Sequence, residues 1–162
     1  MSEKNLIVRR IRNGTVIDHI PAGRSLHVLR ILGIRGDEGY RLALVMNVDS
    51  RKIGRKDIVK IENRYISDSE ASMITLIAPK ATLNIIRNYR VVKKIHLKLP
   101  EMVRGLVKCP NSYCITNNDP EALARFKIEK IDGNEPLLRC IYCETRINSQ
   151  DLIKQIIGER IF

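Results

Sequence analysis

The sequence predicts an α+β protein of two domains, and two observations lead to that prediction. All four cysteines among the 162 residues lie in the last third of the chain, grouped as two close pairs. The first part of the chain instead alternates segments rich in Val and Ile with two segments of helical periodicity. Small modules organised by cysteines are often about 50 residues long. We therefore expect a domain of residues 1–99 and a smaller one of residues 100–162, with the boundary at Leu99-Pro100.

The first domain begins with β-branched and basic residues and then reaches its first helix. Residues 5–12, NLIVRRIR, indicate a strand, and residues 13–23 contain turn signals at Asn13-Gly14 and Pro21. A helix follows, because apolar residues recur at helical spacing and a glycine stands where a C-terminal cap would. The residues of this pattern are Ala22, Leu26, Leu29, Leu32 and Gly33.

Further strands and a second helix complete this domain. The strand segments are residues 40–48, 56–63 and, with a turn or bulge near Asn88, 81–99. Between them, Ser67 and Glu70 form a capping box at the start of a helix. Its apolar stripe continues through Met73, Ile74 and Ile77. The order strand, helix, strand, strand, helix, strand is that of a ferredoxin-like fold, an antiparallel sheet with two helices on one face.

The two cysteine pairs have the spacing of a zinc site. Cys109 and Cys114 form a C-x4-C pair, and Cys140 and Cys143 form a C-x2-C pair after a longer insert. Each pair lies on a tight turn that can aim two sulfurs at one ion. Four thiolates leave no coordination position open, so the zinc is structural and this β-rich module depends on it to fold. Two disulfides are the alternative, which the start of the chain disfavours because MSEKNLIVRR lacks the apolar core of a secretory signal.

The rest of the module contains an alternating segment and a terminal helix. The residues expected to face its small core are Phe126, Ile128 and Ile131. A turn follows at Asp132-Gly133. The last segment, residues 149–162, has an apolar side made of Leu152, Ile153, Ile156 and Ile157, which indicates a short docking helix.

The charge of the chain favours an anionic partner. With 29 Lys and Arg against 18 Asp and Glu, the formal net charge is +11, which suits nucleic acid, nucleotides, an acidic protein or an acidic membrane face. The basic residues are scattered, and aromatic residues make up only 4% of the chain, so stacking platforms for single-stranded nucleic acid are scarce. The sequence contains no run of 18 or more apolar residues, which is the length that would indicate a membrane span. Together with reduced cysteines, this favours a cytoplasmic location.

Several motifs, in order, resemble the regulatory chain of aspartate carbamoyltransferase. They are GTVIDHIPAG (14–23), GRKDIVKIEN (54–63), APKATLNIIRNYRVVKK (78–94), LPE (99–101), CPNSYC and CIYC. The resemblance runs from about residue 5 to residue 145, and agreement of several motifs in order is far more specific than any one of them. It implies an N-terminal ferredoxin-like nucleotide-binding domain and a C-terminal zinc domain.

The resemblance also implies that the chain performs no catalysis. It would bind nucleotide triphosphates and pass their effect to a separate catalytic chain, which condenses carbamoyl phosphate with aspartate. In this family CTP typically inhibits, ATP activates and UTP sometimes acts alongside CTP. Regulatory chains pair through their N-terminal domains, and three such pairs hold two catalytic trimers together.

The resemblance further assigns roles to residues at matching motif positions. Asp18 would accept hydrogen bonds from the ribose, His19 and Lys94 would meet the phosphates, and Lys60 would reach ribose and base. The base would be lined by Ile11, Ile86 and Tyr89, with Val8 and Val91 nearby, and Asn84 would touch phosphate or a second nucleotide. Arg9, Arg10 and Lys93 make the neighbourhood basic. In the zinc domain, the loops at 111–113 and 144–146 would contact the catalytic chain.

Two other functions compete with a regulatory chain. A zinc-ribbon nucleic-acid-binding protein fits the four cysteines and the net charge, but the cysteine module lacks a concentrated basic stripe in its sequence. An enzyme would need a nucleophile with its base, or an open metal position. The three histidines, His19, His27 and His96, lie far apart in the sequence, and the four-cysteine site offers no open position.

Overall fold

The computed structural model describes residues 8–129 and 135–157 of the chain. It divides into two compact units, Met1–Leu97 and Lys98–Phe162. The predicted mixture of α and β structure is confirmed, with an antiparallel sheet and two helices in the first unit and a second, smaller sheet beside the four cysteines in the second.

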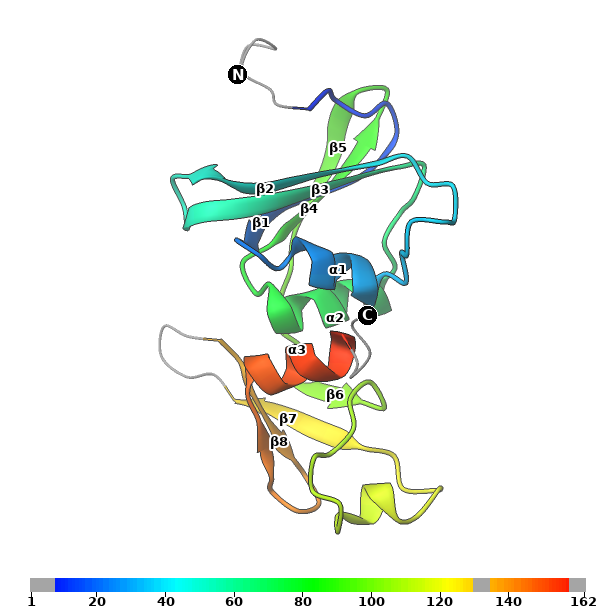
Figure 1. Ribbon diagram of the computed structural model, residues 1–162, viewed down its shortest axis with the longest axis vertical. Coiled ribbons are helices and arrows are strands. Elements are labelled where there is room, and N and C mark those ends of the chain that lie inside the picture. Colours follow the sequence, from blue (N-terminus) through cyan, green and yellow to red (C-terminus); the bar gives the residue numbers. More distant parts are fainter. Residues whose placement is uncertain (1–7, 130–134, 158–162) are drawn as a thin grey trace. The chain divides into compact units, whose positions relative to one another are not determined.

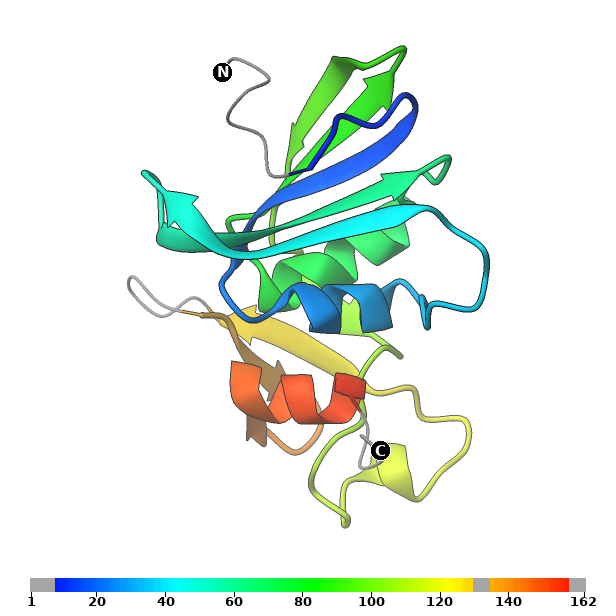
Figure 2. The same cartoon turned by 45° about the horizontal axis from the view of Figure 1, so that its top comes forward.

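The first unit is a five-stranded sheet with both helices on one face, as Figures 1 and 2 show. Its strands are β1 (Gly14–Pro21), β2 (Leu42–Ser50), β3 (Gly54–Glu62), β4 (Thr82–Arg87) and β5 (Arg90–His96). The order across the sheet is β2-β3-β1-β4-β5, and every neighbouring pair is antiparallel. The first four strands, with α1 (Ser25–Ile31) and α2 (Asp68–Ile77), have the predicted ferredoxin-like order, and β5 adds an edge strand next to β4.

The first strand is not where the sequence pattern placed it. Residues 8–13 form no strand, the earlier part of the predicted strand at 5–12 lies outside the described residues, and β1 instead covers most of the segment that was interpreted as turns. Gly14 opens the strand with φ of 140°, and a Cβ there would collide with the carbonyl oxygen of Ile61. This glycine therefore marks a close approach of two strands and not a turn.

Helix α1 ends as predicted but turns a different side inward. Gly33, with φ of 67°, follows the helix, and the N–H of Ile34 donates to Leu29 O at 2.9 Å in a Schellman closure. Val28 is fully buried, whereas Leu26 is 53% exposed. The predicted apolar stripe is thus partly wrong. The helix is short, and one row of buried side chains is enough to pack it against the rest of the unit.

The start of α2 is the predicted capping box. The Ser67 hydroxyl accepts a hydrogen bond from the N–H of Glu70 at 3.2 Å, and the Glu70 carboxylate accepts one from the N–H of Ser67 at 3.0 Å. The same carboxylate accepts a 2.7 Å bond from Arg64, whose guanidinium also reaches the carbonyl of Leu32. The cap therefore ties the start of α2 to the end of α1. The fully buried residues of the helix include Ile74 and Ile77, as predicted.

A buried carboxylate fastens the helical face to the sheet. Asp57 on β3 is fully buried, and its oxygens accept backbone N–H bonds from Gly23 at 2.9 Å, Ser25 at 3.1 Å and Asn47 at 3.0 Å. These donors come from the start of α1 and from an irregular position of β2. Three donors compensate the loss of water around a buried charge, so one side chain connects β3 with two other segments.

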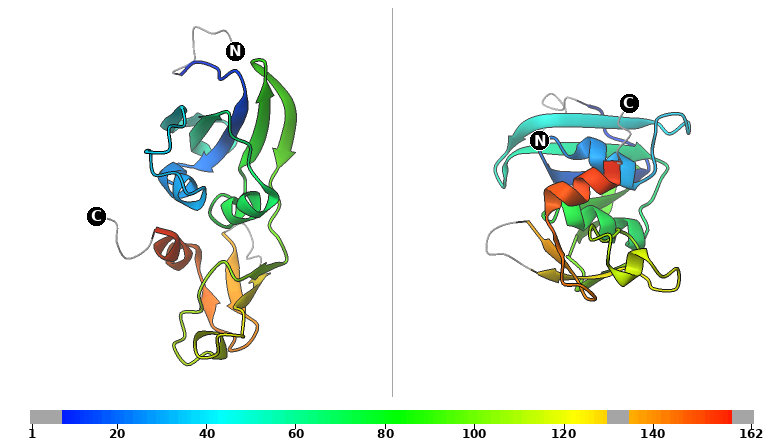
Figure 3. Two further views of the ribbon diagram at one scale, coloured as in Figure 1. Left: turned by 90° about the vertical axis from the view of Figure 1, so that its right-hand side faces the viewer. Right: turned by 60° about the horizontal axis from the view of Figure 1, so that its bottom comes forward.

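The second unit is a four-stranded antiparallel sheet with a helix against one face (Figure 3). Its elements are β6 (Met102–Arg104), β7 (Arg125–Glu129), β8 (Leu137–Cys140), β9 (Arg146–Ile147) and α3 (Ser149–Ile157). Phe126, Leu138, Ile147 and Leu152 are completely buried and form its core. Of the predicted core residues, Phe126 is confirmed and Ile128 is half-buried, while Ile131 and the turn at Asp132-Gly133 lie outside the described residues.

Within the described parts of both units, no helix combines the length and the apolar character that crossing a membrane requires.

Candidate functional site

The structure brings all four cysteines together in the second unit. Cys109 and Cys114 lie on the loop after β6, Cys140 ends β8, and Cys143 lies on the turn between β8 and β9. Their four sulfur atoms all lie within 4.8 Å of one another, and none is in a disulfide. Two segments that are distant in sequence therefore converge on one point.

The sulfur spacing fits a tetrahedral metal ion. Cys109 and Cys143 sulfurs are 3.6 Å apart, and those of Cys114 and Cys140 are 3.8 Å apart. Zinc–sulfur bonds of about 2.3 Å give sulfur–sulfur edges of about 3.8 Å in a regular tetrahedron. The sulfurs are thus placed as ligands of one ion of this size.

The turns that carry the cysteines aim backbone donors at the sulfurs. The N–H groups of Tyr142 and Cys143 donate to the Cys140 sulfur, and the N–H of Asn111 donates to that of Cys109. Glu144 closes the second turn with φ of 65°, and its N–H donates to Cys140 O at 3.0 Å. Such donors stabilise thiolates, which is the form that binds metal.

The thiols differ in how readily they lose a proton. Burial raises the pKa of Cys109 to about 12 and also raises the pKa of Cys140. Burial acts in the same direction on Cys143, but hydrogen bonds with Thr145, Asn111 and Cys109 together outweigh it and lower that pKa to about 6. A bound ion replaces the protons, so metal affinity rises with pH. With all positions taken by sulfur, the centre can hold the fold together but cannot bind a substrate.

The second candidate site lies on the outer face of the first unit's sheet, the face opposite α1 and α2. Side chains alternate along each strand, so fully buried Ile17 and Val59 point to the helices and their neighbours point outward. In the register of the sheet, Val16 pairs with Lys60 on one side and with Asn84 on the other, and Asn84 pairs with Lys94. We call Lys60, Val16, Asn84 and Lys94 the central row. Three strand spacings separate its two lysines, or about 14 Å between their Cα atoms.

A pocket of about 460 Å³ lies at this row. Its lining contains six of the ten residues predicted from the resemblance: Ile11, Lys60, Asn84, Ile86, Tyr89 and Val91. It also contains three that were not assigned a role, namely Arg10, Val16 and Arg90. The volume is that of an ordinary small-molecule site, and the lining combines aliphatic and aromatic surface with fixed cations.

The turn that presents Tyr89 is held in a sparsely populated backbone conformation. Asn88 and Tyr89 form the two-residue loop between β4 and β5, with φ of 49° and 64°. These angles suit a tight hairpin, and the predicted turn near Asn88 is confirmed. The N–H of Tyr89 donates to Arg12 O at 2.9 Å, and the N–H of Asn88 donates to the Asn13 side chain at 3.1 Å. The loop is thus fixed against the segment before β1, which carries Ile11.

Lys60 is the cation most enclosed by this pocket. Its ammonium donates to the backbone carbonyls of Val8 at 3.4 Å and Arg9 at 3.3 Å. Burial, and then the charge of Arg10, lower the pKa of Lys60, while Asp18 acts in the opposite direction. An anionic ligand would offset both the burial of Lys60 and its repulsion by Arg10, because it would add a negative partner to a partly desolvated ammonium. Val8 does not line the pocket but lies beside it through this contact.

Asp18, His19 and Lys94 lie outside the pocket lining. Asp18 pairs with Lys56, at 2.9 Å between Oδ1 and Nζ, and accepts from the N–H of His19 at 2.6 Å. The His19 ring lies 3.1 Å from the Thr82 hydroxyl, at a bulge where its φ is 58°. Burial lowers the pKa of His19, and Lys56, Lys52 and Lys94 lower it further, against the effect of Asp18.

Lys56 is therefore a neighbour of the site that was not predicted from the sequence. Its signal was present, since Lys56 and Lys60 are four positions apart on one strand and so share a face. Val16 was missed because its strand was interpreted as a turn. Arg90 lies directly after the hairpin loop, where only the strand register shows that it faces the pocket.

The loops predicted to contact a partner lie at the surface of the second unit. Tyr113 is 93% exposed, and its N–H donates to the Asn111 side chain at 3.0 Å, so the turn is ordered while the ring points to solvent. Glu144 and Arg146 join an ion-pair network, in which the Glu129 carboxylate pairs with Arg146 and Arg139. Exposed apolar side chains are also present at both cysteine turns: Ile115, Ile141 and Tyr142.

The small sheet also assembles a basic face from separate parts of the sequence. In its register, Arg104 is opposite Arg125, and Lys127 is opposite Arg139, which is opposite Arg146. The sequence of this module contains no concentrated basic stripe, but strand pairing brings together cations that are far apart in the chain. Glu129 neutralises part of this charge and has its pKa lowered by Arg139 and Arg146.

Comparisons with known proteins cover both units. Residues 6–98 match the family model described as the aspartate carbamoyltransferase regulatory chain, allosteric domain, and residues 101–153 match its metal binding domain. A regulatory chain of aspartate carbamoyltransferase from Saccharolobus solfataricus is 67% identical over 153 residues, 94% of each chain. A protein of the same name from Sulfolobus acidocaldarius is 58% identical over 158 residues, which cover 97% of this chain and 94% of the relative.

Proposed function

Because this chain belongs to the family of aspartate carbamoyltransferase regulatory chains, we propose that it transmits nucleotide binding to a separate catalytic chain. The chain is regulatory and not catalytic. In this proposal residues 1–99 bind the effector, and residues 100–162 bind zinc and contact the catalytic chain. Two regulatory chains pair, and such pairs hold catalytic trimers together in the cytoplasm, where they regulate pyrimidine biosynthesis.

The pocket on the outer face is the observation that supports nucleotide binding. Ile11, Ile86 and Tyr89 line it from three different segments and offer an apolar slot for a base. Lys60 lies at one end of the central row, within reach of a ribose, and Asp18 offers acceptors beyond it. Lys94, His19 and Lys56 supply positive charge for the phosphates of CTP, ATP or UTP. We therefore propose that the nucleotide extends along the outer face, from the hairpin at Tyr89 to the bulge at His19.

The sulfur cluster supports zinc as the metal. Zn²⁺ prefers four thiolates in a closed tetrahedron, and the sulfur spacing of 3.6 and 3.8 Å matches its bond length. Bound there, zinc would supply cross-links between the two cysteine turns and no reaction chemistry. The exposed Tyr113 and the neighbouring apolar side chains at those turns offer a surface for the catalytic chain.

A thermal-shift titration tests the effector site. The zinc-loaded chain is melted with increasing CTP, ATP or UTP, and a ligand that binds the folded form raises the melting temperature in a saturable way. Lys60→Ala and Lys94→Ala should each raise the nucleotide concentration needed for a half-maximal shift at least tenfold, since each removes one charged contact. Lys80→Ala removes an equal charge from an exposed position before β4 and should leave the response unchanged.

Two outcomes would count against nucleotide sensing. One is a shift no larger than that given by inorganic triphosphate, which would mean that the base and ribose are not recognised. The other is an equal effect of Lys80→Ala and Lys60→Ala, which would mean that net charge alone attracts the ligand.

The basic face of the small sheet favours a second candidate function, binding of nucleic acid by the zinc module. Contacts of Arg104, Lys127 and Arg139 with phosphates would weaken steeply with added salt. Measuring the binding of a labelled duplex and a labelled single strand at two salt concentrations tests this. Lys127→Glu should abolish binding if the face is responsible and leave any nucleotide response of the first unit intact.

A further inference from the structure

Helix α3 connects the two halves of the sulfur cluster. Its first turn follows β9 directly, through Asn148, whose side chain accepts from the N–H of Asp151 at 2.8 Å. Strand β9 in turn is close to the second cysteine turn, because the N–H of Cys140 donates to Thr145 O at 2.9 Å. The start of α3 is therefore tied by short chain connections to Cys140 and Cys143.

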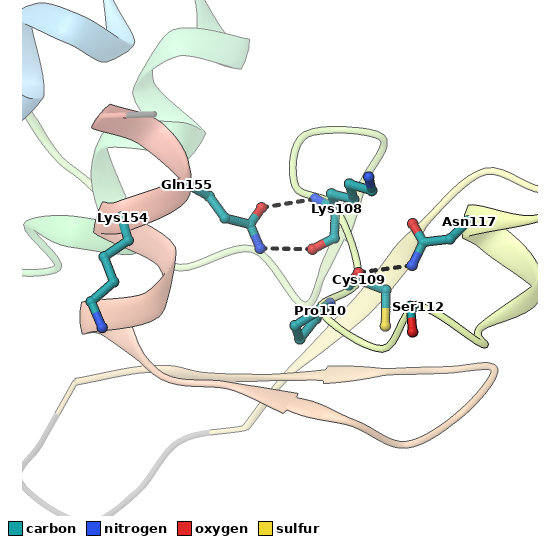
Figure 4. Close-up of a pocket in the computed structure, with 7 residues that line it drawn as sticks. All are labelled: Lys108, Cys109, Pro110, Ser112, Asn117, Lys154 and Gln155. Carbon is teal, nitrogen blue, oxygen red and sulfur yellow. Dashed lines mark hydrogen bonds between the residues drawn. The ribbon is translucent and has the colours of Figure 1, made fainter. Parts of the chain in front are cut away.

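One turn further on, α3 reaches the first cysteine turn. Leu152 is completely buried and anchors the helix in the core. Gln155, three positions later, lies on the same side of the helix. Its amide accepts a hydrogen bond from the N–H of Lys108 at 3.0 Å and donates one to Lys108 O at 2.7 Å. Figure 4 shows this pair of bonds at the edge of a pocket of about 670 Å³.

These two hydrogen bonds hold the residue that directly precedes the first cysteine. Lys108 is in irregular backbone directly before Cys109, and the Gln155 amide pairs with both of its backbone polar groups, as a neighbouring strand would. A second side-chain amide acts just beyond, because Asn117 donates to Cys109 O at 2.9 Å and to Asn111 O at 2.7 Å. The loop that carries the first sulfur is thus held from both sides.

We propose that Gln155 is a positioning residue that keeps the first cysteine turn in its metal-binding geometry and slows release of the ion. Release requires the two cysteine turns to separate, and α3 bridges them. Gln155 lies on α3, two residues after the last residue of the family-model match, at 153. The proposal rests on the proposed zinc site.

The effect should be moderate, because both bonds are exposed to solvent. Groups that contact a metal ligand and fix its orientation typically change metal affinity 10- to 100-fold. Gln155 acts on the backbone beside a ligand and not on the sulfur itself. We therefore expect Gln155→Ala to release zinc roughly tenfold faster than the unchanged chain, at the low end of that range.

Zinc release to an excess of a colorimetric chelator, followed over time with the full zinc-loaded chain, tests the proposal. Gln155→Glu keeps an acceptor for the Lys108 N–H but turns a carboxylate oxygen toward Lys108 O in place of the donor, so it too should release zinc faster than the unchanged chain. Gln150→Ala is the matched control, an exposed glutamine in the first turn of the same helix. Zinc content and helix content, measured before mixing, show that each variant starts folded and loaded.

The outcomes separate this proposal from the zinc site itself. If the unchanged chain binds no zinc, the proposed zinc site is wrong. A loaded chain in which Gln155→Ala releases zinc at the rate of the unchanged chain would overturn the role of Gln155 alone. Equal acceleration by Gln150→Ala would also overturn it, because general weakening of α3 would then explain the effect. If Gln155→Ala is isolated without zinc, refolding with added zinc and a competition titration measure the lost affinity instead.

Discussion

The pocket on the first unit and the sulfur cluster of the second are built in opposite ways. The cluster takes four side chains of one type from two short turns and leaves no coordination position open on a tetrahedral ion. The pocket takes side chains of many types from four strands and the segment before them, and it is open to solvent. Spacing within a turn specifies the first, whereas only strand register specifies the second. Turn sites can therefore be derived from a sequence more directly than sheet-face sites.

The units also differ in what holds their loops together. In the first, the carboxylate of Asp57 collects three backbone N–H groups from two other segments. In the second, the sulfurs of two cysteine turns converge on one point, where the proposed metal ion would link the turns. The Asp57 carboxylate is part of the covalent chain, whereas a metal ion can be removed. The two units should consequently respond very differently to a chelator.

Metal removal should produce the largest effect. Structural zinc contributes on the order of 10–16 kcal/mol in small four-ligand modules, far more than a small core supplies. We expect a strong chelator, or Cys143→Ser, to remove amide hydrogen-exchange protection from β7 and β8 while β1 and β3 stay protected. Undiminished protection of β7 and β8 in the metal-free chain would show that Phe126 and its neighbours fold this unit unaided.

Asp57→Ala should produce the next largest effect, in the first unit. The change leaves three N–H groups without their acceptor, and we expect a loss of roughly 3 kcal/mol in the free energy of unfolding. Urea unfolding of the zinc-loaded chain measures it. Asp49→Ala, an exposed aspartate on β2, is the control and should change stability by less than about 0.5 kcal/mol. Similar losses in the two variants would mean that Asp57 is not a connector.

The sequence predicted those parts of the molecule that depend on neighbouring residues. The capping box of Ser67, the αL glycine at Gly33 and the hairpin at Asn88 each act within a few positions, and all were found. The first strand was missed because Gly14 usually signals a turn, and only the approach of Ile61 explains it. The nucleotide roles came from resemblance, since register alone places Lys60, Asn84 and Lys94 in one row.

Binding of a triphosphate should strengthen as the pH falls, through His19. In the ligand-free chain, burial lowers the pKa of His19 below its ordinary 6.5, so the ring is mostly neutral near pH 7. Phosphates beside it would favour the charged form and raise that pKa in the complex. Affinity should then increase several-fold as the pH falls from the pKa of the complex to that of the free chain, and level off below it.

Calorimetric titrations at a series of pH values test this link. His19→Asn cannot gain a proton and should lose this part of the pH dependence, leaving only the titration of the phosphate itself, with a pKa near about 6. An identical pH profile in His19→Asn would place the phosphates away from the bulge of β1. Zinc content is measured at every pH, because protons compete with the metal for the thiolates and loss of zinc at the acidic end would be a separate effect.

Ser67→Ala should produce the smallest effect and should be confined to the first unit. It removes the acceptor for the N–H of Glu70 and one half of the capping box, which typically costs about 1 kcal/mol. For a unit of this size, such a loss lowers the melting temperature by roughly 4–8 °C. Ser67→Asp restores an acceptor at the helix start and should recover most of the loss. Because no metal takes part in this cap, the shift should be the same with zinc present or chelated. A shift that appears only in the zinc-loaded chain would show that the two units unfold together. The two units would then differ in how their sites are built but not in their stability.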